Sequence, residues 1–187
     1  GIDAYLTGLE QRLAAGQPVE ALRSVASFFV SRVDTEVDKR LEARLQADPS
    51  LRLRVEALLG TAAIANAKLA YQTYVAWFEA ERFRHLMARG AAVQRPLWAS
   101  TSTKNPRYSE TIYVEGLIGP DTINTLPPAT LEAFATGGIA RRTIDADLDT
   151  ARQQLADLAG LGVAMKDVTD FLVVDGVKQF ADSHAAL

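Results

Sequence analysis

The chain has 187 residues, of which 48% are hydrophobic and 23% charged, with a formal net charge of -3. This balance is ordinary for one globular domain and lacks the basic excess of a nucleic-acid-binding protein. There is no cysteine, which excludes disulfides, thiolate catalysis and cysteine-ligated zinc. No apolar run approaches the roughly 20 residues of a membrane-spanning helix, so we expect neither a membrane nor a nucleic acid as partner.

The first third of the chain predicts a helix, a buried strand and a second helix. The opening helix is amphipathic, with apolar residues at helical spacing: Ile2, Tyr5, Leu6, Leu9 and Leu13. After a turn at 16–18, the almost continuously apolar run 24–30 is typical of a strand covered on both faces. Arg32 lies just beyond this strand, and the run 34–40 predicts a helix with acids in its first turn.

The remaining elements alternate between helices and short strands. The run from Gly60 to Ala91 is nearly free of helix breakers, and we expect it to bend or break once. Two further strands are expected. The strand at 97–100 opens into a polar Ser/Thr/Lys/Asn loop, and the strand at 122–126 ends at Pro127–Pro128. The other predicted helices follow Pro49, lie near 113–117, begin at Pro127–Pro128, and cover 148–158 and 167–180.

Three apolar strands separated by helices indicate parallel βα units and therefore an α/β protein. We expect the strands to be parallel neighbours in chain order, because parallel strands need crossover connections. Three strands cannot close a barrel, which needs about eight, and an open sheet of three would keep unpaired edges. The pattern alone therefore predicts a helix-rich part of an α/β fold.

Four segments resemble transaldolase in the form found in actinobacteria and in transaldolase–isomerase fusions. They are Val25–Asp38, Ile64–Tyr71, Leu97–Pro106 and Asp121–Pro128, in family order. The resemblance implies a (β/α)8 TIM barrel, of which residues 1–187 are the carboxyl-terminal part of a single domain. This part would supply about the last three strands with their helices, including a helix-rich insertion over residues 33–95. The other half of the barrel is then expected upstream of Gly1.

The resemblance also implies an activity. Transaldolases move a dihydroxyacetone unit from sedoheptulose 7-phosphate to glyceraldehyde 3-phosphate, which yields erythrose 4-phosphate and fructose 6-phosphate in the cytoplasmic pentose phosphate pathway. They use a Schiff base on a lysine, since a protonated imine withdraws electrons from the neighbouring carbon–carbon bond. They need no metal and no organic cofactor, and the isolated His85 and His184 show no metal-ligand spacing.

The Schiff-base lysine of the family lies in the fourth barrel strand, in an Ile-Lys-Ile-Pro-like context that this sequence lacks. None of the lysines here lies in an apolar strand: Lys39, Lys68, Lys104, Lys166 and Lys178. We therefore expect no catalytic residue in this chain. The lysine and the acid/base carboxylates of the family are expected upstream of Gly1.

The resemblance assigns substrate binding to this chain. Arg32 matches the family's phosphate-binding arginine after strand six, and a guanidinium suits two phosphate oxygens. The alternative is that Arg32 pairs with Asp34 or Glu36. Lys104 matches a second phosphate-binding cation after strand seven, and its alternative is a solvated loop lysine.

Ser27 and Phe29 match positions that line the substrate pocket, and period-two alternation places both on one side of the strand. The alternative is a plain core strand. For the chain as a whole, the alternative to half of a transaldolase is a non-catalytic α/β interaction module descended from the family.

Overall fold

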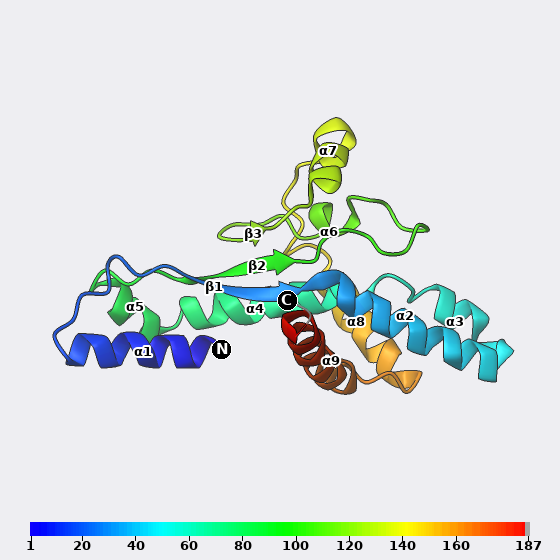
Figure 1. The fold of residues 1–187 in the computed structure, drawn as a ribbon, viewed down its shortest axis with the longest axis horizontal. Helices are drawn as coiled ribbons and strands as arrows, with labels where there is room; N and C mark the ends of the chain where they lie inside the picture. The colour runs from blue at the N-terminus through cyan, green and yellow to red at the C-terminus, as the bar shows by residue number, and fades with distance from the viewer. Residues whose placement is uncertain (186–187) are drawn as a thin grey trace.

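The computed structural model describes residues 1–185, which are built around a three-stranded parallel sheet (Figure 1). The strands are β1 (Ser24–Phe29), β2 (Gln94–Ala99) and β3 (Ile123–Asn124), and they lie in the order β1-β2-β3. β1 pairs with β2 from Ser24 with Gln94 to Phe29 with Ala99, and Leu97 pairs with Ile123. The predicted parallel order is confirmed. β3 is shorter than the predicted run 122–126, because the register with β2 covers only two residue pairs.

Five helical elements separate β1 from β2 along the chain. They are α2 (Val30–Ala47), η1 (Pro49–Leu51), α3 (Arg52–Glu56), α4 (Ala62–Phe78) and α5 (Glu81–Met87). The expected break in the run 60–91 falls between α4 and α5, where Ala80 adopts an extended conformation. Helix α4 packs against both α2 and α8 (Leu148–Gly160).

Helix α2 begins earlier than the predicted start at Asp34, so its first turn contains no acid. The helix follows β1 directly, and no side chain caps its first turn. Instead, the backbone N–H of Ser31 donates to the carbonyl oxygen of Ser100, 3.0 Å away in the chain that leaves β2. The residue that follows β2 therefore accepts a hydrogen bond from one of the first N–H groups of α2, which have no partner within the helix.

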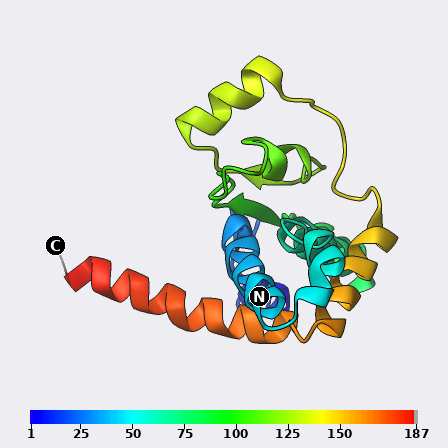
Figure 2. The same cartoon turned by 90° about the vertical axis from the view of Figure 1, so that its right-hand side faces the viewer.

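In the described part of the chain, the remaining helices are α1, at the start of the chain, and the four helices that follow β2. Helix α1 (Ile2–Ala14) is joined to α5 by Arg82, whose guanidinium contacts Asp3 at 2.6 Å and Glu10 at 2.7 Å. After β2 come α6 (Ile112–Glu115), α7 (Pro128–Gly137), α8 and α9 (Met165–Ala185). Figure 2 shows α9 projecting away from the rest of the molecule. Within residues 1–185, no helix combines the length and the apolar character needed to cross a membrane.

The hydrophobic core lies between the sheet and the helices, with buried side chains from α1, α2, α4, α5, α8 and α9. Its largest side chains include Trp98 of β2 and Phe83 of α5. The rings of Trp98 and Phe28 pack edge to face with 5.7 Å between their centroids. This contact joins β1 and β2 on the side of the sheet that faces the core.

The other face of β1 is exposed, which corrects the expectation that this strand is covered on both faces. Val25 is 45% and Phe29 40% exposed. Among residues 1–185, β1 has a strand neighbour on one edge only. The apolar run 24–30 is therefore buried to a much smaller extent than its composition predicts.

Candidate functional site

Polar side chains join the three strands where they end. The hydroxyls of Ser31 and Ser100 lie 2.9 Å apart and connect the exits of β1 and β2. The Thr101 hydroxyl donates to the side-chain oxygen of Asn124 at 2.7 Å and so connects β2 to β3. Ser100 adopts a positive φ of 55°, which turns the chain sharply away from β2. In parallel α/β folds this edge is where ligands bind.

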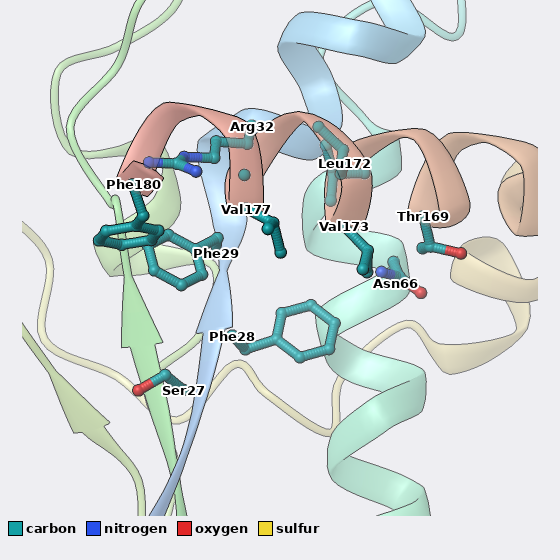
Figure 3. Close-up of a pocket in the computed structure, with 12 residues that line it drawn as sticks. Ser27, Phe28, Phe29, Arg32, Asn66, Thr169, Leu172, Val173, Val177 and Phe180 are labelled. Atoms are coloured by element: carbon teal, nitrogen blue, oxygen red, sulfur yellow. The ribbon is translucent and has the colours of Figure 1, made fainter. Parts of the chain in front are cut away.

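Arg32 faces a pocket at this edge, between β1, α2, α4 and α9 (Figure 3). The pocket has a volume of about 340 Å³. The Arg32 guanidinium carbon lies 4.6 Å from the centre of the Phe29 ring. On its other side lies Gly176 of α9, where a built Cβ would be in ordinary contact with the Arg32 Nη1 atom at 3.7 Å.

Arg32 has no carboxylate partner within residues 1–185, so the alternative pairing with Asp34 or Glu36 is wrong. Glu36 instead contacts Arg40, with a distance of 2.7 Å between the charged atoms. Asp34 is buried and accepts hydrogen bonds from Tyr113 and from the backbone of Ala63. The Arg32 charge is therefore free for a ligand in the pocket.

Ser27 and Phe29 line the same pocket as Arg32, and both are exposed. The structure thus brings three of the four predicted site residues together. Within residues 1–185 the face of β1 that carries Ser27 and Phe29 is not packed as a core strand would be. Sequence reasoning missed Asn66 of α4, which lines this pocket and lies within a segment already matched to the family.

Lys104 is placed elsewhere. Its ammonium donates to the hydroxyl of Ser102 at 2.9 Å and lies at a second pocket of about 290 Å³, beside Asp38 and Tyr108. Lys104 does not line the pocket that Arg32 lines. The second pocket is also lined by Thr35 and Lys39 of α2, and Lys39 lies seven residues, or almost two full helical turns, after Arg32.

Two carboxylates of α2 are the residues that sequence reasoning missed most clearly. Asp34 is only 1% exposed, and its burial raises the pKa to about 6. It accepts from the Ala63 amide at 2.7 Å and from the Tyr113 hydroxyl at 2.8 Å. Asp38 accepts from the Gly60 amide at 3.0 Å and from the Tyr108 hydroxyl at 2.6 Å, and burial raises its pKa as well. The four-residue spacing of these acids beside an apolar stripe was the signal.

The lysines occupy helices and a loop. All five lie within residues 1–185, and none is in a strand. Lys68 is the buried one, and its ammonium donates to the carbonyl oxygen of Ala146 at 2.8 Å. Over the same residues, His, Asp and Glu side chains form no group of three or more placed to hold a metal ion.

A sequence model described as transaldolase/fructose-6-phosphate aldolase matches residues 1–187. The chain belongs to this family. A transaldolase of Parafrankia sp. (strain EAN1pec) is 53% identical over 97% of this chain and 48% of its own length. Transaldolases of Mycolicibacterium smegmatis and Mycobacterium tuberculosis are 48% and 46% identical, over 100% and 97% of this chain and 49% and 48% of their own length. The resemblance to transaldolase is thereby confirmed, and the chain spans about half the length of the curated relatives it matches.

Proposed function

We propose that this chain is the carboxyl-terminal half of a transaldolase and acts together with an amino-terminal half. The matched relatives are about twice as long and carry the name transaldolase. In the proposed assembly β1, β2 and β3 are the last three strands of a (β/α)8 barrel, and the unpaired edge and exposed face of β1 meet the missing strands. An apolar face such as that of Val25 and Phe29 is covered when such a barrel closes.

The proposed reaction transfers a dihydroxyacetone unit from sedoheptulose 7-phosphate to glyceraldehyde 3-phosphate, in the pentose phosphate pathway of the cytoplasm. In this proposal the Schiff-base lysine belongs to the amino-terminal half. The placement of all five lysines of this chain outside strands supports that division of roles. No metal or organic cofactor takes part in the proposed chemistry.

The observation that carries the proposal is the guanidinium of Arg32 at the carboxyl end of β1, which has no carboxylate partner within residues 1–185. A guanidinium presents a planar set of donors that matches two oxygens of a phosphate. The Phe29 ring beneath it holds the guanidinium plane toward the pocket, and a cation over an aromatic face is attractive in itself. In this role Arg32 binds the phosphate of the sugar, while the Ser27 hydroxyl hydrogen bonds a sugar hydroxyl.

Lys104 is proposed as a second phosphate-binding cation. It belongs to the loop that leaves β2, its ammonium is exposed, and its one hydrogen bond goes to the neutral hydroxyl of Ser102. Within residues 1–185 the ammonium forms no ion pair with a carboxylate, so in this proposal a phosphate that approaches this edge of the sheet binds there. Lys104 lines a different pocket from Arg32. In this proposal both cations bind the single phosphate of fructose 6-phosphate, Arg32 from the junction of β1 and α2 and Lys104 from the loop after β2.

The test joins this chain to the amino-terminal half of the Parafrankia transaldolase and measures transfer from fructose 6-phosphate. We expect activity, and we expect Arg32→Ala to raise KM for phosphorylated sugars far more than for unphosphorylated ones. The expected loss is on the order of 2–4 kcal/mol, which is typical of removing one partner of a charged hydrogen bond. Arg84→Ala, at an exposed arginine of α5, is the control and should leave KM unchanged.

The alternative of a non-catalytic interaction module makes the opposite prediction. It requires that the joined protein folds and yet transfers nothing from fructose 6-phosphate. Equal losses with phosphorylated and unphosphorylated sugars in Arg32→Ala would instead mean that Arg32 supports the fold and does not bind phosphate.

A further inference from the structure

Helix α2 carries acids at four-residue intervals on one face, which we call the acidic stripe: Asp34, Asp38 and Glu42. Each acid binds one residue of the chain that follows β2, which we call the 101–113 loop. The partners come in the reverse chain order: Tyr113, Tyr108 and Arg107, at donor–acceptor distances of 2.8, 2.6 and 3.1 Å. The loop is therefore attached to α2 at three successive helical turns.

The first two acids of the stripe also accept hydrogen bonds from outside the loop. Asp34 and Asp38 also accept from backbone amides of Ala63 and Gly60, at and just before the amino-terminal end of α4. These bonds orient both carboxylates independently of the loop. Gly60 has a φ of +70°, and a Cβ there would lie 2.6 Å from the Tyr108 ring, so only glycine lets this ring lie against the backbone. The anchoring points of the loop thus belong to two packed helices.

Lys104 lies within the anchored part of the loop. One residue before it, the Thr103 hydroxyl donates to the carbonyl oxygen of Ser109 at 2.7 Å. One residue after it, the Asn105 side chain accepts from the Arg107 amide at 3.0 Å, and the Asn105 carbonyl accepts from the Tyr108 amide at 3.1 Å. The backbone on both sides of Lys104 is therefore fixed relative to α2, the helix that begins beside Arg32.

We propose that the acidic stripe and its two tyrosines, Tyr108 and Tyr113, position the 101–113 loop so that Lys104 binds the substrate phosphate. This inference rests on the proposed function, in which Lys104 is a phosphate-binding cation. Tyr108 and Tyr113 are positioning residues and act through the loop. A free loop would lose conformational entropy on each binding event, whereas a loop that is already ordered loses little.

The test uses the complete enzyme and the variant Tyr108→Phe, which removes one hydroxyl and keeps the ring on Gly60. We expect amide hydrogen exchange across residues 101–109 to become faster by about fivefold or more, because one anchor of the loop is lost. We expect KM for fructose 6-phosphate to rise about five- to tenfold with kcat within about twofold, and KM for unphosphorylated fructose to stay unchanged. Tyr113→Phe should act in the same direction. Tyr5→Phe, which removes a hydroxyl bond to the Ala92 carbonyl at the far end of the molecule, is the matched control.

The double variant Tyr108→Phe/Lys104→Ala separates positioning from general stability. If Tyr108 acts through Lys104, the double variant should have the KM of Lys104→Ala alone. Independent multiplication of the two effects, or a fall in kcat as large as the rise in KM, would overturn the inference. Unchanged exchange and unchanged KM in Tyr108→Phe would overturn it too.

Lys104→Ala alone tests the proposed function at this residue. If it leaves KM for fructose 6-phosphate unchanged, the assignment of Lys104 to phosphate is wrong. In that case, faster amide hydrogen exchange in Tyr108→Phe would mean only that the acidic stripe stabilises the loop. The positioning inference would then be overturned together with the assignment of Lys104. If Lys104→Ala raises KM and Tyr108→Phe does not, the inference alone fails and the proposed function stands.

Discussion

The guanidinium of Arg32 lies over the ring of Phe29, with 4.6 Å between the guanidinium carbon and the ring centre. The two residues are three positions apart, but they belong to different elements, since Phe29 ends β1 and Arg32 lies in the first turn of α2. The strand-to-helix junction thus places a cation and an aromatic face together at the mouth of a pocket.

Phe29→Leu should weaken phosphate binding without removing the cation. Leucine keeps an apolar side chain at this position but lacks the aromatic face that attracts Arg32, which is worth about 0.5–1 kcal/mol at an exposed site. In the complete enzyme we expect KM for fructose 6-phosphate to rise about two- to fivefold, with little change for fructose. Val25→Ala, on the same exposed face of β1 but outside the pocket, is the control. An unchanged KM in Phe29→Leu would show that the ring does not orient the guanidinium.

The isolated chain should form no reducible Schiff base with fructose 6-phosphate. Four of its lysines are exposed, and a lysine in water is mostly protonated at neutral pH and a poor nucleophile. The fifth, Lys68, is buried in α4 and donates to a backbone carbonyl. Borohydride treatment followed by mass spectrometry should therefore detect no stoichiometric adduct. An adduct on Lys104 would make that residue the nucleophile and contradict its assignment to phosphate.

Asp34 should make the stability of the fold fall as pH rises. Its pKa is raised from 3.8 to about 6, chiefly because burial disfavours the charged form. Between these two values the folded state binds more protons than the unfolded state, so the free energy of unfolding decreases with rising pH. Asp34→Asn removes this titration while its amide still accepts from Ala63. Relative to the unsubstituted chain, the variant should therefore gain on the order of 2–3 kcal/mol from about pH 4 to pH 7.

Urea unfolding at several pH values measures this difference, and Asp48→Asn is its control. The pKa of the exposed Asp48 is lowered, mainly by its hydrogen bond from the Ser50 hydroxyl, so its contribution to stability is lost as pH falls. The two variants should therefore differ from the unsubstituted chain with opposite pH dependences. A pH-independent difference for Asp34→Asn would mean that Asp34 stays ionised in the folded protein over this range.

The predictability of the fold follows from how local each signal is. The strands around 24–30 and 97–100 were found because short apolar runs bounded by polar residues are a local signal. The start of α2 was misplaced because its first turn is completed by the Ser100 carbonyl, a contact 69 positions away. The exposure of β1 could not be predicted from its composition. An apolar strand has the same sequence pattern whether or not its second face is covered within the chain.

The sequence predicts some parts of the candidate site and not others. Ser27, Phe29 and Arg32 lie within six residues, so one matched segment places all of them in one pocket. The position of Lys104 depends on hydrogen bonds from Tyr108 and Tyr113 to α2. The spacing of residues along the loop does not predict how the loop runs along this helix. Asp34 and Asp38 lie four residues apart beside an apolar stripe, a pattern that a solvated helix face also produces. Their burial becomes evident only when Ala63 and Gly60 are seen to point at them.

Gly60→Ala should destabilise the fold more than Gly16→Ala. Both glycines have a similar positive φ, +70° and +68°, so alanine introduces similar backbone strain of about 1–2 kcal/mol at each. A Cβ at Gly16 meets nothing within 4 Å, whereas a Cβ at Gly60 would lie 2.6 Å from the Tyr108 ring. Gly60→Ala must therefore also displace this ring and weaken its bond to Asp38, which should add about 1–3 kcal/mol. Urea unfolding of the two variants measures the difference, and equal destabilisation would show that Tyr108 moves aside freely and does not anchor the loop.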